Sequence, residues 1–207
     1  MKATPVVIAV SAPIGGGKTA LARSLADTLG TSALLHYDDY ERATAQSMDQ
    51  LAAWLDAGAD FGCLQAPGFV DDLSSLRSGH PVVERGSGRR IEPQPFIVVD
   101  TPLGRADHEA AACIDHLVWI ALPLDVALAR KLKEFAVLNA SSSMAEKTAF
   151  IAWLDRYLTF YIATVSKVLA LQEQRVRATA DQILDGQLAT PLLVREVVKV
   201  LGIDGLR

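Results

Sequence analysis

Short, nearly continuous apolar runs recur along the chain, separated by segments with helical spacing of their apolar residues. Uninterrupted runs of this kind are typical of strands buried on both faces of a parallel sheet, where neither face needs polar residues. The pattern predicts five strands, at Pro5–Val10, Ser32–Leu35, Phe96–Val99, His116–Leu122 and Gln182–Leu184.

Helices are predicted where leucines and valines recur every three or four positions, which places them on one helix face. This spacing occurs over 19–29, over 124–138 and from Pro191 onward, where a proline in the first turn costs no hydrogen bond. Strands that alternate with helices predict an α/β fold with a five-stranded, mostly parallel sheet.

Glycine and proline divide the rest of the chain into two contrasting parts. From Leu124 to Asp185 neither residue occurs, so this stretch is expected to be mostly helical, with a break at the polar patch Asn139–Ser143. Within it Trp153, Tyr157, Phe160 and Tyr161 recur at helical spacing, as aromatic residues facing a core do. The segment 58–95, rich in glycine, proline and charge, is expected to be the least regular part.

Composition narrows the class of protein. With 207 residues and 50% hydrophobic residues, the chain can bury a core within one domain. A formal charge of −4 argues against a protein that coats nucleic acid. Cys63 and Cys113 are far apart and the histidines have no metal spacing, so neither a disulfide framework nor a zinc site is expected. No apolar run is long enough to cross a bilayer, and a cytoplasmic protein without membrane contact is expected.

The most informative segment is APIGGGKT, Ala12–Thr19, which follows the first predicted strand and opens the first predicted helix. It matches the phosphate-binding pattern G-x-x-x-x-G-K-[ST] except at its first position, where alanine replaces glycine. Glycines let the backbone turn several N–H groups toward a phosphate, and the helix N-terminus adds partial positive charge. The alternative is an ordinary glycine-rich turn between a strand and a helix.

If the segment binds a nucleotide, the Lys18 amine is expected at the β- and γ-phosphates and the Thr19 hydroxyl at Mg²⁺. The residues expected to contact the nucleotide are Ile14, Gly15, Gly16, Gly17, Lys18, Thr19 and Ala20.

Three carboxylates are expected at the same edge of the sheet, because ligands collect where parallel strands end. Asp38 and Asp39 follow the second predicted strand in HYDDY, and Asp100 ends the run FIVVD. A carboxylate at this edge can hold Mg²⁺ or take a proton from an attacking hydroxyl. It can also only cap the following helix, and for Asp39 the two interpretations stay open.

Taken in order, APIGGGKT, HYDDY, FIVVDTP, LPLDVALARKLKEF and ADQILDG resemble the uridine kinase-like P-loop kinases. This group includes uridine kinase, nicotinamide riboside kinase, phosphoribulokinase and bacterial pantothenate kinase. The resemblance extends over most of the chain. It implies a three-layer P-loop NTPase fold in a single domain, 1–207, with a helical lid around 130–147 and a substrate-binding insertion around 58–95.

The resemblance also implies residue roles. Asp38 corresponds to the aspartate that acts as catalytic base on the substrate hydroxyl, and Arg130 with Lys131 to the basic pair that closes over the phosphates. The chain departs from the family pattern in having Ala12 for glycine, and Asp100-Thr101 where relatives have Glu-Gly. Its lid also has few basic residues.

These observations together predict an ATP-dependent kinase for a hydroxyl of a small metabolite, a nucleoside, riboside or sugar-like compound. Lys18, Asp38 and Arg130 are the predicted catalytic residues, Thr19 and Asp100 the predicted Mg²⁺ ligands, and a homodimer is compatible with the sequence. Arg89 and Arg90 either form a solvated turn or hold an anionic substrate group. The rival hypotheses are a P-loop NTPase that switches a partner protein and a nucleotide-binding module without catalysis.

Overall fold

The computed structural model describes residues 4–40, 48–64, 66, 68–84 and 88–203. Its centre is a five-stranded sheet with the strand order β2-β5-β1-β6-β7, in which every neighbouring pair is parallel. The five predicted strands are confirmed with small changes at their ends, as β1 Val6–Ser11, β2 Ser32–His36, β5 Phe96–Asp100, β6 His116–Ala121 and β7 Gln182–Asp185.

The central strand β1 shows why these runs are apolar on both faces. Val7 and Ala9 point into one core cluster, while Ile8 and Val10 point into the other, and all four side chains are fully buried. Since successive side chains of a strand point to opposite faces, a strand covered on both sides must be apolar at every position.

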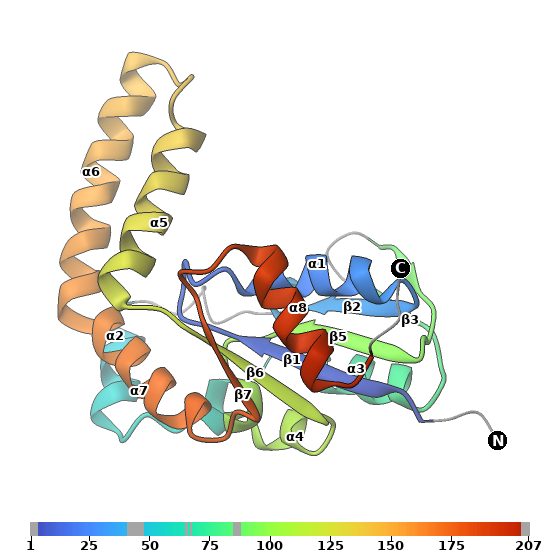
Figure 1. The fold of residues 1–207 in the computed structure, drawn as a ribbon. Helices are drawn as coiled ribbons and strands as arrows, with labels where there is room; N and C mark the ends of the chain where they lie inside the picture. Colours follow the sequence, from blue (N-terminus) through green and yellow to red (C-terminus); the bar gives the residue numbers. More distant parts are fainter. Residues whose placement is uncertain (1–3, 41–47, 65, 67, 85–87, 204–207) are drawn as a thin grey trace.

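Helices cover both faces of the sheet and make three layers, as expected (Figure 1). On one face α1, Lys18–Leu29, packs beside α8, Thr190–Val200. The other face is covered by α3 Phe69–Arg77, α4 His108–Ala111 and α7 Ser166–Arg177, with α2 Met48–Asp56 at its margin.

The segment 58–95 is more regular than its composition suggested. It contains α3 and a short antiparallel pair, β3 Val82–Val83 with β4 Arg90–Ile91. Helix α3 forms because Phe69, Leu73 and Leu76 lie on one face and are buried against the sheet. Two-residue strands are too short to produce a periodic signal. Residues 65, 67 and 85–87 of this segment lie outside the described residues.

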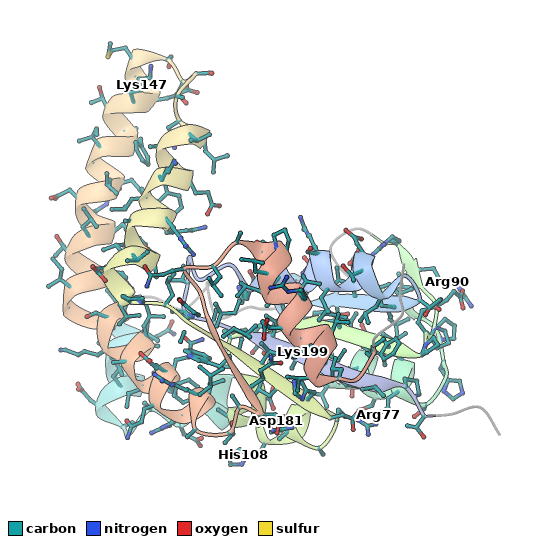
Figure 2. All side chains as sticks on the ribbon, viewed as in Figure 1. Arg77, Arg90, His108, Lys147, Asp181 and Lys199 are labelled. Carbon is teal, nitrogen blue, oxygen red and sulfur yellow. The ribbon has the colours of Figure 1, made fainter. Side chains whose placement is uncertain are left out.

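Two long helices form a hairpin that projects from one end of the domain (Figure 1). They are α5, Leu124–Leu138, and α6, Met144–Phe160, and the turn between them falls at the predicted break. The Ser143 hydroxyl and the Glu146 carboxylate form a capping box at the start of α6. Lys147 lies near the far end of the hairpin (Figure 2). A π-helical turn, Tyr161–Val165, leads from α6 into α7.

Of the four aromatic residues expected to face a core, Tyr161 is buried, at 7% exposed in the π-helical turn, but those of α6 do not face the domain core. Trp153 packs edge-on against Phe135 of α5 with 5.0 Å between ring centroids, and it stacks on Tyr157 at 5.2 Å. None of the 17 residues of α6, all within the described part of the chain, is buried. The aromatic stripe therefore joins the two helices of the hairpin to each other.

No helix in the described ranges is long and apolar enough to span a membrane.

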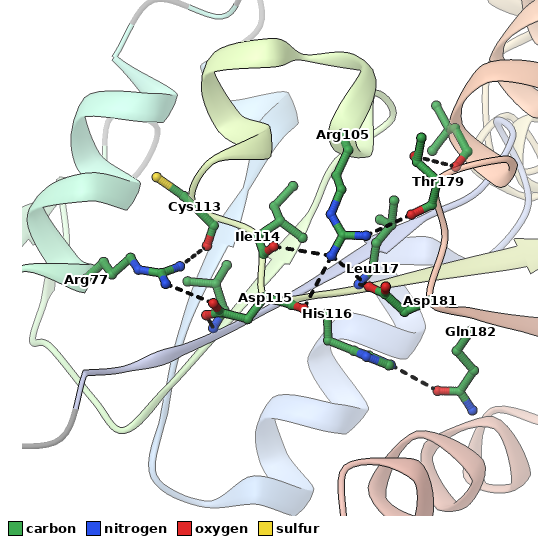
Figure 3. Close-up of polar contacts among 12 residues, drawn as sticks. Arg77, Arg105, Cys113, Ile114, Asp115, His116, Leu117, Thr179, Asp181 and Gln182 are labelled. Atoms are coloured by element: carbon green, nitrogen blue, oxygen red, sulfur yellow. Dashed lines mark hydrogen bonds and ion pairs between the residues drawn. The ribbon is translucent and has the colours of Figure 1, made fainter.

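A network of hydrogen bonds joins the amino-terminal ends of β6 and β7 (Figure 3). It lies at the sheet edge opposite the candidate phosphate loop, Ala12–Thr19. The Arg105 guanidinium donates to the Asp181 carboxylate at 2.7 Å and to the carbonyls of Ile114, Asp115 and Thr179. Asp181 also accepts from the Leu117 N–H at 2.7 Å. These contacts tie the start of β7 to the start of β6.

The charge of Asp181 gives this network a pH dependence. Partial burial raises the pKa of Asp181, but the hydrogen bonds from Arg105 and the Leu117 N–H outweigh burial and leave the pKa below its ordinary value. The ionised carboxylate therefore stabilises the folded state above the unfolded-chain pKa of about 3.9. This contribution is lost as the pH falls through the lower pKa of the folded state.

We expect Asp181→Asn to lower the free energy of unfolding by about 1 kcal/mol at pH 7, a modest value because the carboxylate is 40% exposed. Denaturant unfolding at several pH values should show a shallower acid slope for the variant below about pH 4. Asp155→Asn, at an exposed position of α6, is the matched control. An identical acid slope for parent and Asp181→Asn would contradict this account.

Candidate active site

The phosphate loop between β1 and α1 has a backbone that requires glycine. Gly15 and Gly17 have φ of 77° and 88°, values that side chains with a Cβ rarely adopt. A Cβ on Gly15 would lie 2.2 Å from the carbonyl oxygen of Ala127 in the first turn of α5. The loop therefore packs directly against the base of the hairpin, and α1 begins at Lys18, as expected.

Ala12 fits the position where the phosphate-binding pattern has glycine. Its φ is not positive, since among the described non-glycine residues only Ala59 has a positive φ. The methyl group is 1% exposed and belongs to the core between the sheet and α1. A Cβ on Gly16 would lie 2.7 Å from it, so the bare backbone of Gly16 makes room for the alanine.

The predicted residues of the loop lie at the carboxyl edge of the sheet in the expected order. Lys18 and Thr19 occupy the first turn of α1, with Ala20 exposed beside them, and the Ile14 side chain is 38% exposed. The Lys18 amine lies 3.6 Å from a carboxylate oxygen of Asp38, which follows β2 in the 3-10 turn η1, Tyr37–Asp39. Asp38 is 61% exposed. The sequence-predicted lysine and carboxylate are thus brought together.

Asp100 lies deeper than Asp38, at the end of β5, and is 1% exposed. The His36 imidazole, opposite it in the β2–β5 register, donates from Nδ1 to Asp100 Oδ2 at 3.1 Å. Burial raises the pKa of Asp100, but hydrogen bonds with His36 and Thr19 and the charge of Lys18 outweigh burial and hold the pKa below its ordinary value. The same hydrogen bond raises the pKa of His36 despite burial of the ring.

The environment of Asp100 fits a divalent cation. Its second oxygen, Oδ1, is buried and has no hydrogen-bond partner among the described residues. A buried carboxylate oxygen without a partner is costly, and an ionised carboxylate beside a hydroxyl is a donor set that Mg²⁺ prefers. Asp100 and Thr19 are therefore suited to hold Mg²⁺.

The two basic residues that the sequence assigned to the lid, Arg130 and Lys131, are engaged in contacts within the protein. The Arg130 guanidinium donates to the carbonyl of Gly186, just after β7, at 3.0 Å. Lys131 pairs with Glu134 at 2.9 Å and lies 5.0 Å from the centroid of the Phe135 ring. Arg130 thus links the base of α5 to the segment that follows the last strand, while Lys131 stays on the surface of the hairpin.

Gln172 is a residue of this region that the sequence reasoning missed. It is 4% exposed on α7, and its amide donates to the carbonyls of Ala12 at 3.3 Å and Pro102 at 2.6 Å. It therefore joins the phosphate loop and the segment after β5 to the helix that continues from the hairpin. The available signal was its place between Leu169 and Val176 on the apolar face of α7.

Solved structures share this fold, which confirms the expected three-layer α/β architecture. Similar solved structures include a possible uridine kinase from Bacillus stearothermophilus, 16% identical over 89% of this chain and 91% of that chain, with a TM-score of 0.54. Another is shikimate kinase from Acinetobacter baumannii in complex with shikimate, 16% identical over 99% and 97% of the two chains, with a TM-score of 0.51. No protein-family profile and no curated protein matches the chain in sequence. At these identities the likeness establishes the fold alone.

We expect Gln172→Leu to lower the free energy of unfolding by about 1–3 kcal/mol, because it removes the donor that two carbonyls share in a buried place. Gln174→Leu, two positions along α7 and exposed, should change it by less than about 0.5 kcal/mol. Denaturant unfolding of both variants against the parent chain measures the difference. Equal effects of the two substitutions would show that the amide of Gln172 is not needed.

Proposed function

We propose that the protein is an ATP-dependent kinase that transfers a phosphoryl group to a hydroxyl of a small metabolite. The observation that carries the proposal is the meeting of Lys18, at the start of α1, with carboxylates from two other strand ends. Asp38 lies 3.6 Å from the Lys18 amine, and Asp100 is buried beside Thr19. Phosphoryl transfer needs a phosphate cradle, a metal carboxylate and a group that orients the acceptor, and this edge offers all three.

In the proposed mechanism, the N–H groups of the phosphate loop and the Lys18 amine bind and orient the β- and γ-phosphates. Thr19 and Asp100 would hold Mg²⁺, which neutralises charge on the phosphate oxygens when bound. Asp38, exposed at the mouth of the site, would accept the proton of the attacking hydroxyl. Asp39, its neighbour, is the alternative base.

The hairpin would act as the lid of this kinase, over 130–147, and the segment 58–95 as the substrate-binding insertion. Arg130 would cover the transferring phosphoryl group from the lid. For this its side chain must exchange the carbonyl of Gly186 for phosphate oxygens.

The proposal predicts that Lys18→Ala strongly lowers the rate of phosphoryl transfer and weakens Mg-ATP binding, because it removes the cation at the β/γ position. A loss of about 10²–10³-fold in kcat is expected for one such electrostatic contact. Calorimetric titration with Mg-ATP and a coupled ATP-consumption assay provide the two readouts. Lys199→Ala, at an exposed position near the end of α8, serves as control. Parental binding and turnover in Lys18→Ala would refute the phosphate-loop assignment.

A second prediction separates a kinase from a regulatory NTPase. Asp38→Asn keeps the size of the side chain but cannot take a proton, so acceptor phosphorylation should fall by about 10²–10⁴-fold. Mg-ATP affinity should change little, because the loop supplies most of that binding. Transfer at saturating ATP is compared with Asp39→Asn.

The comparison has three distinct results. A loss confined to Asp38→Asn supports Asp38 as the base, and a loss confined to Asp39→Asn assigns that role to its neighbour. Full activity in both variants contradicts a carboxylate base at this edge.

A further inference from the structure

A polar cavity of about 540 Å³ lies beside the edge strand β2, a volume typical of small-molecule sites. It is lined by residues of α1, of β2 and of η1, and by Glu84 and Arg89, which flank the β3–β4 pair next to this edge of the sheet (Figure 1). Six of its lining residues are charged or polar, and they converge from these separate elements: Arg23, Asp27, His36, Asp39, Glu84 and Arg89.

Two lining residues of the cavity are direct neighbours of residues of the candidate active site. His36 lines it and also donates to Asp100, the carboxylate suited to hold Mg²⁺. Asp39 lines it as well and directly follows Asp38 in η1. A molecule in the cavity would therefore contact the immediate neighbours of Asp38 and Asp100.

The wall opposite α1 is held in place by the β3–β4 pair. The Glu84 N–H donates to the carbonyl of Arg89 at 2.8 Å, and their side chains approach to 3.5 Å. Glu84 is 7% exposed, so its carboxylate is fixed in the cavity wall. Burial and the charge of the nearby Glu84 raise the pKa of Asp39, so a hydrogen-bond donor would stabilise the ionised form of the Asp39 carboxylate.

The chemistry of the lining suits hydroxyl groups. Two guanidinium groups and three carboxylates nearly cancel in charge, so the cavity has no cationic excess for a phosphate or carboxylate ligand. Leu34 is the one apolar residue among the described lining residues, and none of them is Phe, Tyr or Trp. The one ring among them, the His36 imidazole, is engaged in its hydrogen bond with Asp100, so a planar base meets no open apolar ring face on which to stack. A hydroxyl both donates and accepts, and can therefore use the guanidinium and carboxylate groups together.

We infer that this cavity is the acceptor site and that the acceptor is a neutral, polyhydroxylated compound of the sugar or polyol class. The inference rests on the proposed kinase function and narrows it, because it excludes nucleosides and anionic acceptors. It also assigns different roles to the two arginines of the GSGRR segment. Arg89 faces the cavity, whereas Arg90 pairs with Glu92 at 2.6 Å and lies at the outer edge of the domain (Figure 2).

The test uses the full chain with saturating Mg-ATP. Unphosphorylated aldoses, ketoses and sugar alcohols, a set of nucleosides, and shikimate as an anionic acceptor are offered in parallel, and products are identified by mass. We expect a monophosphate from the sugar or polyol set. For that acceptor, Arg89→Gln and Glu84→Gln should raise KM about 10- to 100-fold, the effect of one lost charge-assisted hydrogen bond. KM for ATP should stay unchanged.

The matched controls are Arg90→Gln and Glu92→Gln, which should leave both KM values at the parental level. Preference for a nucleoside or for shikimate would overturn the inference, as would a parental acceptor KM in both Arg89→Gln and Glu84→Gln. If Glu84→Gln does not fold, the comparison of Arg89→Gln with Arg90→Gln decides. The Arg89 side chain is 62% exposed, so its replacement should not prevent folding. Mg-ATP binding, measured by calorimetry without acceptor, separates the two proposals: a parent chain that does not bind Mg-ATP refutes the kinase itself.

Discussion

The packing of the phosphate loop against the first turn of α5 is the constraint on which the rest of the candidate site depends. Gly15 approaches the Ala127 carbonyl so closely that no side chain fits between them. This contact sets the path of the loop, and the path of the loop sets the start of α1 and the direction of Lys18. It also couples the loop to the projecting hairpin, so a displacement of the first turn of α5 must also displace the loop at which phosphate would bind.

The amino-terminal and carboxyl edges of the sheet differ in role: contacts at the first stabilise the fold, and groups at the second are placed to bind a ligand. At the amino-terminal edge, Arg105 and Asp181 satisfy each other and the backbone around them, and the strands are tied together. At the carboxyl edge, polar groups are left without partners, as Asp100 Oδ1 and Gln172 Oε1 are among the described residues. An unsatisfied buried polar atom costs stability, and an unpartnered carboxylate oxygen beside Thr19 is what a cation site needs before its ligand arrives.

At the carboxyl edge of the sheet, two cationic side chains make contacts that they could give up for other partners. Lys18 pairs with exposed Asp38, and Arg130 bonds to the Gly186 carbonyl. Such contacts hold long side chains in place at small cost and release them readily, because solvent screens the exposed partner. The more buried pair, His36 with Asp100, is of a different kind, since burial makes its hydrogen bond harder to give up.

The sequence by itself determined the elements with a strong local signal. The five apolar runs, α1, α5 and α8, the turn between α5 and α6, and the glycine-rich loop with Lys18 all follow from residues that are neighbours in the chain. The convergence of Lys18, Asp38 and Asp100 could also be predicted, because parallel strands bring their carboxyl ends to one edge.

Only the tertiary structure decided which side chains meet across long separations in sequence. The partners of Gln172 lie 160 and 70 residues away, and the cavity beside β2 joins α1 to the β3–β4 pair, so no local pattern could indicate either. The aromatic stripe of α6 shows the same limit. Its spacing predicts a buried helix face, but whether that face meets the sheet or α5 depends on how the hairpin leaves the domain. Periodicity indicates that a helix face is covered, but only the packing of the whole chain decides which element covers it.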